Sequence, residues 1–403
     1  MISLRKNQVF FLIFIVHIFG LILYYNSDSL RDIAYGLPLG ALFFYLIAVV
    51  INQGLTIQRG FHTFLWSKYF IGYALLFYVI LTQSILAYTV EGDINSRFIR
   101  ETIFIIFPLL SVAIITYFLN TEKLDFYIKL LFAGVIVAFF LEKGISSIFS
   151  LNFDFVESLI YSRFSSESGL AFLIGLFAFY FLIKNQKLFF LLSLFFMFTS
   201  GKRTVLAAFI PCVAILYFLK VFRVDINRYK LLIAIAALVV NAVAIYFIHL
   251  LVSGEFDEFI VTNTGLPPNS FTKGRYNLWV LITNRFGLNF LGSGLGSISE
   301  FLVSDLDYPL HNPLNDVLKV CVEHGFLVFA LWFMTFYYVN SRTNGGFVIA
   351  VYSNVLFLTT NVLIYFFFMF CFYFIQISFL EKMYRREKVN PQTQPISEKH
   401  ATV

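Results

Sequence analysis

The stretch FFMFTSGKRTVLAAFIP, residues 195–211, places two cationic side chains, Lys202 and Arg203, between two apolar runs. The Ser-Gly pair before the cations predicts a tight turn. Cations among Phe, Leu and Val are costly unless an anion meets them. The stretch therefore predicts two apolar helices joined by a short turn whose cations hold an anionic group.

Apolar runs of about 18 residues recur along the whole 403-residue chain. Hydrophobic residues make up 59% of the chain and charged residues 13%, whereas a soluble domain carries about 25% charge. This composition predicts an all-α polytopic integral membrane protein whose first partner is the lipid bilayer. In such proteins the positions of Lys and Arg mostly reflect the orientation of the spans in the membrane. The net charge of +6 therefore does not indicate a nucleic-acid partner.

The sequence carries no Walker loop, no HExxH motif and no cysteine pattern of a metal site. Cys212, Cys321 and Cys371 lie far apart and are interpreted as small apolar fillers. None of these motifs therefore indicates a metal or cofactor site.

The apolar runs define about twelve candidate transmembrane helices in a single domain over residues 1–380. Two larger segments remain on one side, a first at residues 146–168 and a major one at residues 253–324. Long loops without structure are uncommon, so the major segment is expected to hold short helices on the membrane surface. The polar tail, residues 381–403, is predicted to be disordered. The candidate spans are 8–25, 33–52, 69–90, 102–119, 126–145, 169–184, 187–200, 204–221, 231–252, 325–340, 346–361 and 362–380.

The distribution of cations orients these spans. With the N-terminus in the cytoplasm, most of the 29 Lys and Arg residues fall in cytoplasmic segments, which favours cytoplasmic N- and C-termini. Lys202 and Arg203 then face outward, against this bias. The run before them, residues 187–200, is short for a hydrocarbon core about 30 Å thick. The turn is expected near or below the outer headgroups, and snorkelling of its cations to lipid phosphates is the alternative interpretation.

The major outer segment contains FTKGRYNLWVLITNRFG, residues 271–287. From Gly274 onward it predicts a short amphipathic helix with Leu278, Leu281 and Ile282 on one side and Trp279 as an interfacial anchor. Arg275 stands at the start of this helix, one turn before Trp279. It is either a solvated side chain on an interfacial helix or a ligand for an anion.

The stretch FLGSGLGSISEF, residues 290–301, follows that helix. Its glycines at 292, 294 and 296 permit a tight turn or a close approach of the backbone to a ligand. No strand precedes it, which argues against a dinucleotide-binding fingerprint. A plain turn is the favoured interpretation.

The next stretch is DYPLHNPLNDVLKVCVEHGFLVFALWF, residues 307–333. Asn312 followed by Pro313 predicts a helix start with Asn312 as the cap. His311 then lies beside free backbone N–H groups, which attract anions, and a neutral imidazole there is a candidate general base. A structural role for His311 is the alternative, and His324 is predicted to be ordinary helix packing.

Arg163, in YSRFSSESG at residues 161–169, lies in the first outer segment. Arg163, Arg203, Arg275 and His311 are thus predicted to face the same side of the membrane. Arginines at headgroup depth suit a lipid-linked diphosphate, because guanidinium binds phosphate oxygens in a bidentate manner and stays charged. They also stabilise the negative charge of a departing diphosphate.

Together these stretches resemble the O-antigen polymerase and O-antigen ligase superfamily of bacterial envelope glycosyltransferases. The resemblance rests on an outward SGKRT turn that opens a span, on GRxxxW (Gly274, Arg275 and Trp279), on LGxGxG, and on HN opening a helix that ends in EHGF. Their order and spacing match over residues 160–340. The resemblance implies a GT-C-like membrane fold in the inner membrane, with a periplasmic active site and a polyprenyl-diphosphate-linked oligosaccharide as donor.

By the same resemblance, Arg203 and Arg275 bind the donor diphosphate, with Lys202 and Asn312 beside them in the matched motifs. His311 helps to deprotonate or orient the acceptor hydroxyl. Arg163 matches only through YSRF and its loop position.

Within the superfamily, polymerases transfer the growing chain onto a new lipid-linked repeat unit, and ligases transfer it onto lipid A–core. The GKR turn and the form of the His311 motif favour a polymerase, which implies a chain-length regulator as a possible partner. Ile174 stands where the polymerase pattern has a glycine, eleven residues after Arg163, so the ligase stays open. A polysaccharide transporter or flippase is the non-enzyme alternative, although no internal repeat or mid-membrane charge favours it.

Overall fold

The computed structural model describes residues 6–26, 30–53, 69–91, 96–118, 123–144, 168–308 and 312–389. Within these ranges the chain is helical and contains no strand. Six helices are long and apolar enough to cross a membrane, which confirms the predicted all-α membrane class. Six further apolar helices are shorter, at 10–17 residues each, so the predicted number of spans is not decided by length.

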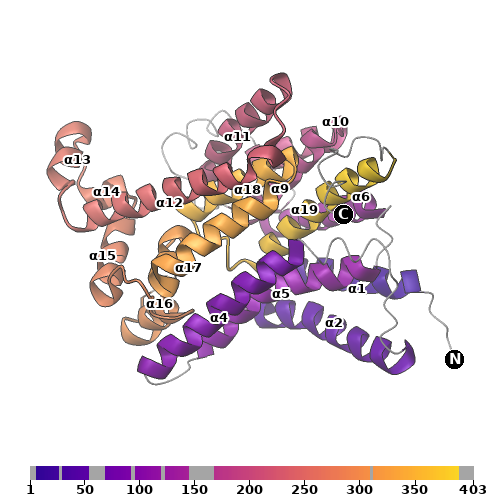
Figure 1. The fold of residues 1–403 in the computed structure, drawn as a ribbon, viewed down its shortest axis with the longest axis horizontal. Helices are drawn as coiled ribbons and strands as arrows, with labels where there is room; N and C mark the ends of the chain where they lie inside the picture. Colours follow the sequence, from indigo (N-terminus) through magenta and orange to yellow (C-terminus); the bar gives the residue numbers. More distant parts are fainter. Residues whose placement is uncertain are drawn as a thin grey trace, which may run out of the picture.

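Long helices lie where the sequence has its apolar runs (Figure 1). The last of them continues to Val389, so the segment predicted to be a disordered tail from residue 381 begins as helix. Residues 390–403 lie outside the described part of the chain. The helices are α1 (Lys6–Asn26), α2 (Arg31–Gln53), α4 (Ile71–Glu91), α5 (Ser96–Phe118), α6 (Leu124–Lys143), α9 (Leu170–Ile183), α10 (Lys187–Thr199), α11 (Arg203–Val221), α12 (Lys230–Val252), α17 (Asp316–Asn340), α18 (Asn344–Thr359) and α19 (Phe366–Val389).

Short helical elements occupy the major segment between α12 and α17, at the left of Figure 1. They stack beside the long helices and connect α12 to α17 through a series of turns. A further short 3₁₀ helix, η4 (Ile226–Tyr229), precedes α12. The elements of the major segment are α13 (Asp257–Thr264), α14 (Pro268–Phe271), α15 (Arg275–Phe286), α16 (Ser297–Glu300) and the π-helical turn η5 (Phe301–Asp305).

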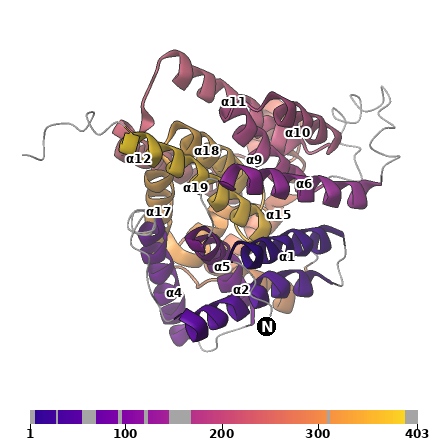
Figure 2. The same ribbon diagram turned by 90° about the vertical axis from the view of Figure 1, so that its right-hand side faces the viewer.

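Helix α9 is the centre of the hydrophobic core. All residues from Leu170 to Phe181 are buried, and α9 contacts α6, α10, α11, α18 and α19, which surround it in Figure 2. Aromatic rings fill these contacts: the Phe179 ring lies 5.2 Å from Tyr352 and the Phe177 ring 5.5 Å from Phe132. A helix that is apolar on every side is stable only when other helices cover it completely.

Two hydrogen bonds join the ends of long helices. Ser168 before α9 donates a hydrogen bond of 2.6 Å to Glu142 in the last turn of α6. Asn344 at the start of α18 donates one of 2.7 Å to the Val224 carbonyl, just after α11. The first bond joins two helix ends that are predicted to face outward, and the second joins two that are predicted to face the cytoplasm; the orientation in a membrane stays a prediction.

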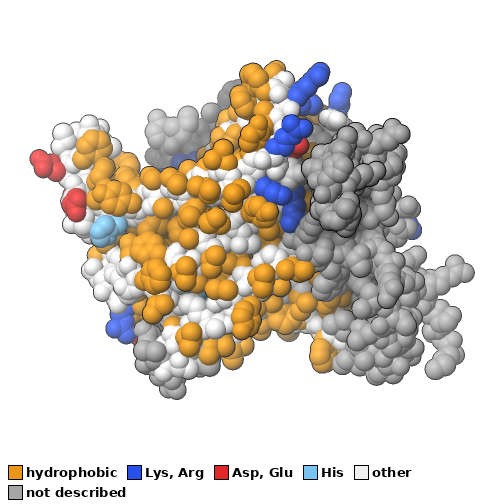
Figure 3. Space-filling view, in the orientation of Figure 1, with side chains coloured by type: hydrophobic (Ala, Val, Ile, Leu, Met, Phe, Trp, Pro, Cys, Tyr) orange, Lys and Arg blue, Asp and Glu red, His pale blue; other side chains and the backbone are white. Residues whose placement is uncertain are grey.

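Charged side chains are segregated along α12. Arg228 and Lys230 lie at its start, and Asp257 and Glu258 open α13 just beyond its end. In Figure 3, Lys and Arg gather mainly at the upper right, with an acidic side chain among them, while the other acidic side chains in view lie at the far left and a further cationic patch lies at the lower left. The apolar surface of α12 lies between these two charged ends.

Helix α17 is broken at Gly325, whose φ of 73° and ψ of 171° are accessible only to glycine. The Phe326 N–H, which would reach back to Val322 in a regular helix, donates instead to the Asn289 carbonyl at 3.3 Å. The Val322 carbonyl in turn accepts from Ser293 N–H at 3.1 Å. Residues 289–294 thus exchange hydrogen bonds with the broken helix, and we call this contact the backbone crossing.

The glycines at residues 292, 294 and 296 allow the backbone crossing and the close contacts beside it. A Cβ on Gly292 would overlap with the backbone of α17 at the break, and one on Gly296 would lie 2.9 Å from the Arg97 backbone in α5. Helix α4 is attached through Tyr88, whose hydroxyl donates to the Leu295 carbonyl at 2.8 Å. The stretch predicted to be a plain turn therefore joins α5 and α17 by close backbone contact and α4 through a side-chain hydrogen bond.

Replacing Gly325 with alanine should disrupt the backbone crossing, because the new Cβ would overlap with the Phe290 carbonyl and the φ/ψ pair is unsuitable for alanine. Gly265 is the matched control, since its φ is also positive at 67° but no atom lies within 4 Å of the added Cβ. Gly265→Ala should cost about 1–2 kcal/mol of backbone strain. Thermal unfolding in detergent should show a much larger loss for Gly325→Ala, and equal losses would contradict the tight crossing.

Candidate functional site

Two of the predicted site residues, Arg163 and His311, lie outside the described residues. Lys202 and Arg203 are half-buried at the turn between α10 and α11. Arg275 begins α15 and is also half-buried. Asn312 lies just before α17.

The turn at Lys202 is built as the sequence predicts. Gly201 takes a positive φ of 66°, Lys202 occupies the N-cap position and Arg203 is the first residue of α11. The Lys202 ammonium lies over the Phe172 ring of α9, 5.5 Å from its centre. Both cations therefore stand where the N–H groups of the first turn of α11 lack intrahelical partners, an arrangement that favours anions.

Helix α15 positions Arg275 through its buried face. Gly274 caps the helix with a φ of 82°. Trp279 is only 7% exposed, and its indole N–H donates to the Pro313 carbonyl at 3.0 Å. The prediction that Trp279 is an interfacial anchor is therefore wrong, because the indole N–H finds its partner inside the protein. The same bond holds α15, and with it Arg275, against the segment that contains Asn312.

Next to Arg275, Tyr276 ties α15 to α13. Its hydroxyl donates a long hydrogen bond of 3.5 Å to the Asp257 carboxylate. Burial and the negative charge of Asp257 raise the pKa of Tyr276. The phenol thus stays protonated at neutral pH and keeps donating to Asp257.

Helix α17 begins later than predicted. Its cap is Asn315, whose side chain accepts from the Leu318 N–H at 2.9 Å and donates to the Leu358 carbonyl at 3.0 Å. The predicted start at Asn312 and Pro313 is therefore wrong. Leu314 takes a positive φ of 54°, so the helix cannot run continuously from Asn312 to Asn315. The Asn312 side chain accepts a hydrogen bond from Lys319 instead.

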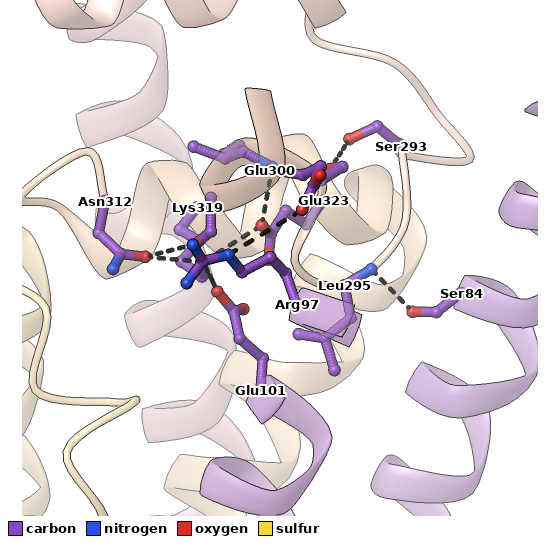
Figure 4. Close-up of polar contacts among 12 residues, drawn as sticks. Ser84, Arg97, Glu101, Ser293, Leu295, Glu300, Asn312, Lys319 and Glu323 are labelled. Atoms are coloured by element: carbon purple, nitrogen blue, oxygen red, sulfur yellow. Dashed lines mark hydrogen bonds and ion pairs between the residues drawn. The ribbon is translucent and has the colours of Figure 1, made fainter. Parts of the chain in front are cut away.

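Asn312 belongs to a buried polar cluster where α5, α16 and α17 meet (Figure 4). The Lys319 ammonium donates to Glu101 at 2.9 Å, to the Asn312 amide oxygen at 2.9 Å and to Glu323 at 3.2 Å. The side chains of Lys319, Glu101 and Glu323 are 2%, 5% and 0% exposed. We call Lys319, Glu101, Glu323, Asn312 and Ser299 the Lys319 cluster.

The two carboxylates of the Lys319 cluster are held differently. Glu101 Oε1 accepts from the Ser299 hydroxyl at 2.5 Å as well as from Lys319. Glu323 Oε1 accepts from the Ile298 N–H at 3.2 Å as well as from Lys319. The second oxygen of each carboxylate, Oε2, is buried and has no hydrogen-bond partner among the described residues. Two carboxylates thus share one ammonium.

Arg97 lies at the edge of the Lys319 cluster, one turn before Glu101 on α5. Its guanidinium comes within 4.0 Å of Glu300, and the two side chains are 21% and 34% exposed. An ion pair this long and exposed contributes little to stability. Arg97 therefore marks the side on which the cluster approaches solvent.

Sequence reasoning missed the Lys319 cluster, although part of it was detectable. Lys319 and Glu323 are spaced i, i+4 within a strongly apolar stretch, a pattern that indicates a paired and buried charge. Glu101 is 218 residues away from Lys319, so only the tertiary fold brings it into the cluster.

Comparisons of the chain with protein-family models, with curated proteins and with solved structures find no match. In the described part of the chain, His, Cys, Asp and Glu side chains do not gather in a group that could hold a metal ion. The candidate functional groups in the described part of the chain are the cations of the α10–α11 turn, Arg275 and the Lys319 cluster.

Replacing Lys319 with methionine should destabilise the protein by about 3–5 kcal/mol, because it leaves Glu101 and Glu323 buried without a counter-ion. Lys129→Met is the control, since Lys129 pairs with Asp125 at 2.9 Å but both side chains are about a third exposed. That change should cost at most about 1 kcal/mol. Thermal unfolding in detergent measures both losses.

Adding Glu101→Gln and Glu323→Gln to Lys319→Met should recover much of the lost stability, because no buried charge remains. If the single Lys319→Met variant unfolds at the wild-type temperature, the cluster is not the buried ion pair described above.

Proposed function

We propose that the protein is an O-antigen polymerase of the bacterial inner membrane. It transfers a growing undecaprenyl-diphosphate-linked glycan onto a new lipid-linked repeat unit at the periplasmic face. The observation that carries this proposal is the pair of cations, Lys202 and Arg203, at the start of apolar helix α11, directly after an apolar helix of 13 residues. The resemblance over residues 160–340 supplies the reaction class.

The proposed scaffold has about twelve spans with both termini in the cytoplasm. Helices α9 and α10 contain 14 and 13 residues, which corresponds to about 20 Å each at 1.5 Å per residue. A hydrocarbon core is about 30 Å thick. The α10–α11 turn therefore lies below the level of the outer headgroups, where the diphosphate of a lipid carrier can meet its cations.

In the proposed reaction, Arg203 and Arg275 bind the donor diphosphate and stabilise its charge as it leaves. Lys202 adds a third positive charge, and Arg163 is assigned the same task from the first outer loop. Asn312 accepts from Lys319 through its amide oxygen, so its amide N–H groups are its means of contacting substrate. His311 deprotonates or orients the acceptor hydroxyl.

Arg203→Ala should abolish most polymer formation while the protein still inserts into the membrane. Arg203→Lys should restore little of it, because an ammonium cannot replace the guanidinium fork on a diphosphate. Arg228→Ala is the matched control, since Arg228 is an exposed cation beside Asp225, before α12. Membrane-protein level and the lipopolysaccharide ladder on a gel are the two readouts. A normal ladder from well-expressed Arg203→Ala protein would refute the assignment.

Deletion of the gene, with and without complementation, separates the polymerase from the ligase and the flippase. Loss of a polymerase leaves core that carries a single repeat unit. Loss of a ligase leaves bare core, with polymer stranded on its lipid carrier. An unchanged ladder excludes both enzymes for this glycan, and it also excludes a flippase for the same lipid-linked unit, because its loss would leave bare core.

A further inference from the structure

The Lys319 cluster buries two carboxyl groups beside a single ammonium. Glu101 and Glu323 share the single ammonium of Lys319, and all three side chains are at most 5% exposed. Ionisable side chains in a membrane protein are costly, and they usually mark proton or substrate pathways. An ion pair that only stabilises the fold needs one carboxylate for each ammonium. We therefore look for a functional role of the second carboxylate.

Glu101 has the geometry of a positioned base. Its Oε1 is fixed by the Lys319 ammonium at 2.9 Å and the Ser299 hydroxyl at 2.5 Å. Its Oε2 is buried and has no hydrogen-bond partner among the described residues. One carboxylate oxygen is thus held in place while the other stays unoccupied, which is how a third group orients a catalytic base.

Glu101 is better placed for substrate than Glu323. Glu323 is 0% exposed and is held by the Ile298 N–H, next to the backbone crossing. Glu101 follows the partly exposed Arg97 by one turn of α5 and shares Lys319 with the half-buried Asn312. In Figure 4, Arg97, Asn312 and Glu101 surround the Lys319 ammonium.

We propose that Glu101 is the base that accepts the proton of the acceptor-sugar hydroxyl. This inference rests on the proposed glycosyl transfer and assigns His311 the orienting role. The hydroxyl oxygen forms a bond to the anomeric carbon of the donor, and the bond from that carbon to the diphosphate oxygen breaks. The electron pair leaves with the diphosphate. The hydroxyl proton passes to Glu101 Oε2 and later to water.

Access to Glu101 requires a local rearrangement. The Glu101 side chain is 5% exposed, and Arg97 and Asn312 lie beside the Lys319 ammonium to which it is bonded (Figure 4). The proposal therefore requires that binding of the acceptor displace one of these two side chains. Arg97 is the weaker barrier, because its contact with Glu300 is long at 4.0 Å.

The test compares Glu101→Gln with Glu323→Gln in nanodiscs, with lipid-linked repeat units as substrate. Each change removes one negative charge beside Lys319 and preserves side-chain shape. Glu101→Gln should slow chain extension by about 100-fold or more, the usual contribution of a general base, while donor binding is retained. Glu323→Gln should lose activity only in proportion to its loss of stability. Glu142→Gln, which also removes a carboxylate that accepts from a serine, should extend chains at the wild-type rate.

The outcomes separate this proposal from the proposed function. If the wild-type protein extends no chain, the polymerase assignment itself fails. If wild type is active and Glu101→Gln is equally fast, or if both glutamine variants lose the same activity, Glu101 is not the base. Should Glu101→Gln fail to fold, Glu101→Asp tests the same point, because it keeps the charge and withdraws the carboxylate by one methylene. A rate about tenfold lower, at unchanged thermal stability, then supports the proposal, and an unchanged rate overturns it.

Discussion

The exchange of backbone hydrogen bonds at Gly325 is the contact on which the candidate site depends. It holds the part of α17 before Gly325 against residues 289–294. This part of the helix carries Lys319 and Glu323. Because Leu295 is also bonded to Ser84 and Tyr88, the same segment sets the distance between α17 and α4. A side chain at Gly292 or Gly325 would push residues 289–294 away from α17 and disturb the Lys319 cluster that α17 forms with α5 and α16.

Much of the fold was predictable because long apolar runs separated by polar turns leave few alternatives to membrane helices. The turn at Lys202 was predictable for a local reason, since Ser-Gly followed by cations sets both the turn and the helix start. The cap at Asn315 was not, because Pro313 makes Asn312 the stronger local signal, whereas in the fold the Asn312 side chain accepts from Lys319 and Asn315 caps the helix. Glu101 and the burial of Trp279 depend on partners distant in sequence, which no local pattern encodes.

The chemistry of the molecule is concentrated at the ends of its helices. Lys319 lies in the first turn of α17 and Glu101 in the second turn of α5, while Arg203 and Arg275 each begin a helix. Helix starts offer unpaired N–H groups, and cations placed there add to the same positive potential. Helix α9, at the centre of the apolar core, holds the surrounding helices in place and contains no charged residue.

The shortness of α10 also has a consequence for the surrounding lipid. Leu188, Leu191 and Phe198 are exposed on this helix, so lipid tails must cover a hydrophobic surface only about 20 Å tall. A bilayer accommodates such a mismatch by thinning around the protein. The bilayer would then form a shallow depression beside Arg203. Under the proposed function this is the outer leaflet, and a carrier lipid that diffuses into the depression would bring its headgroup down to the protein. In that proposal the membrane itself takes part in the delivery of substrate.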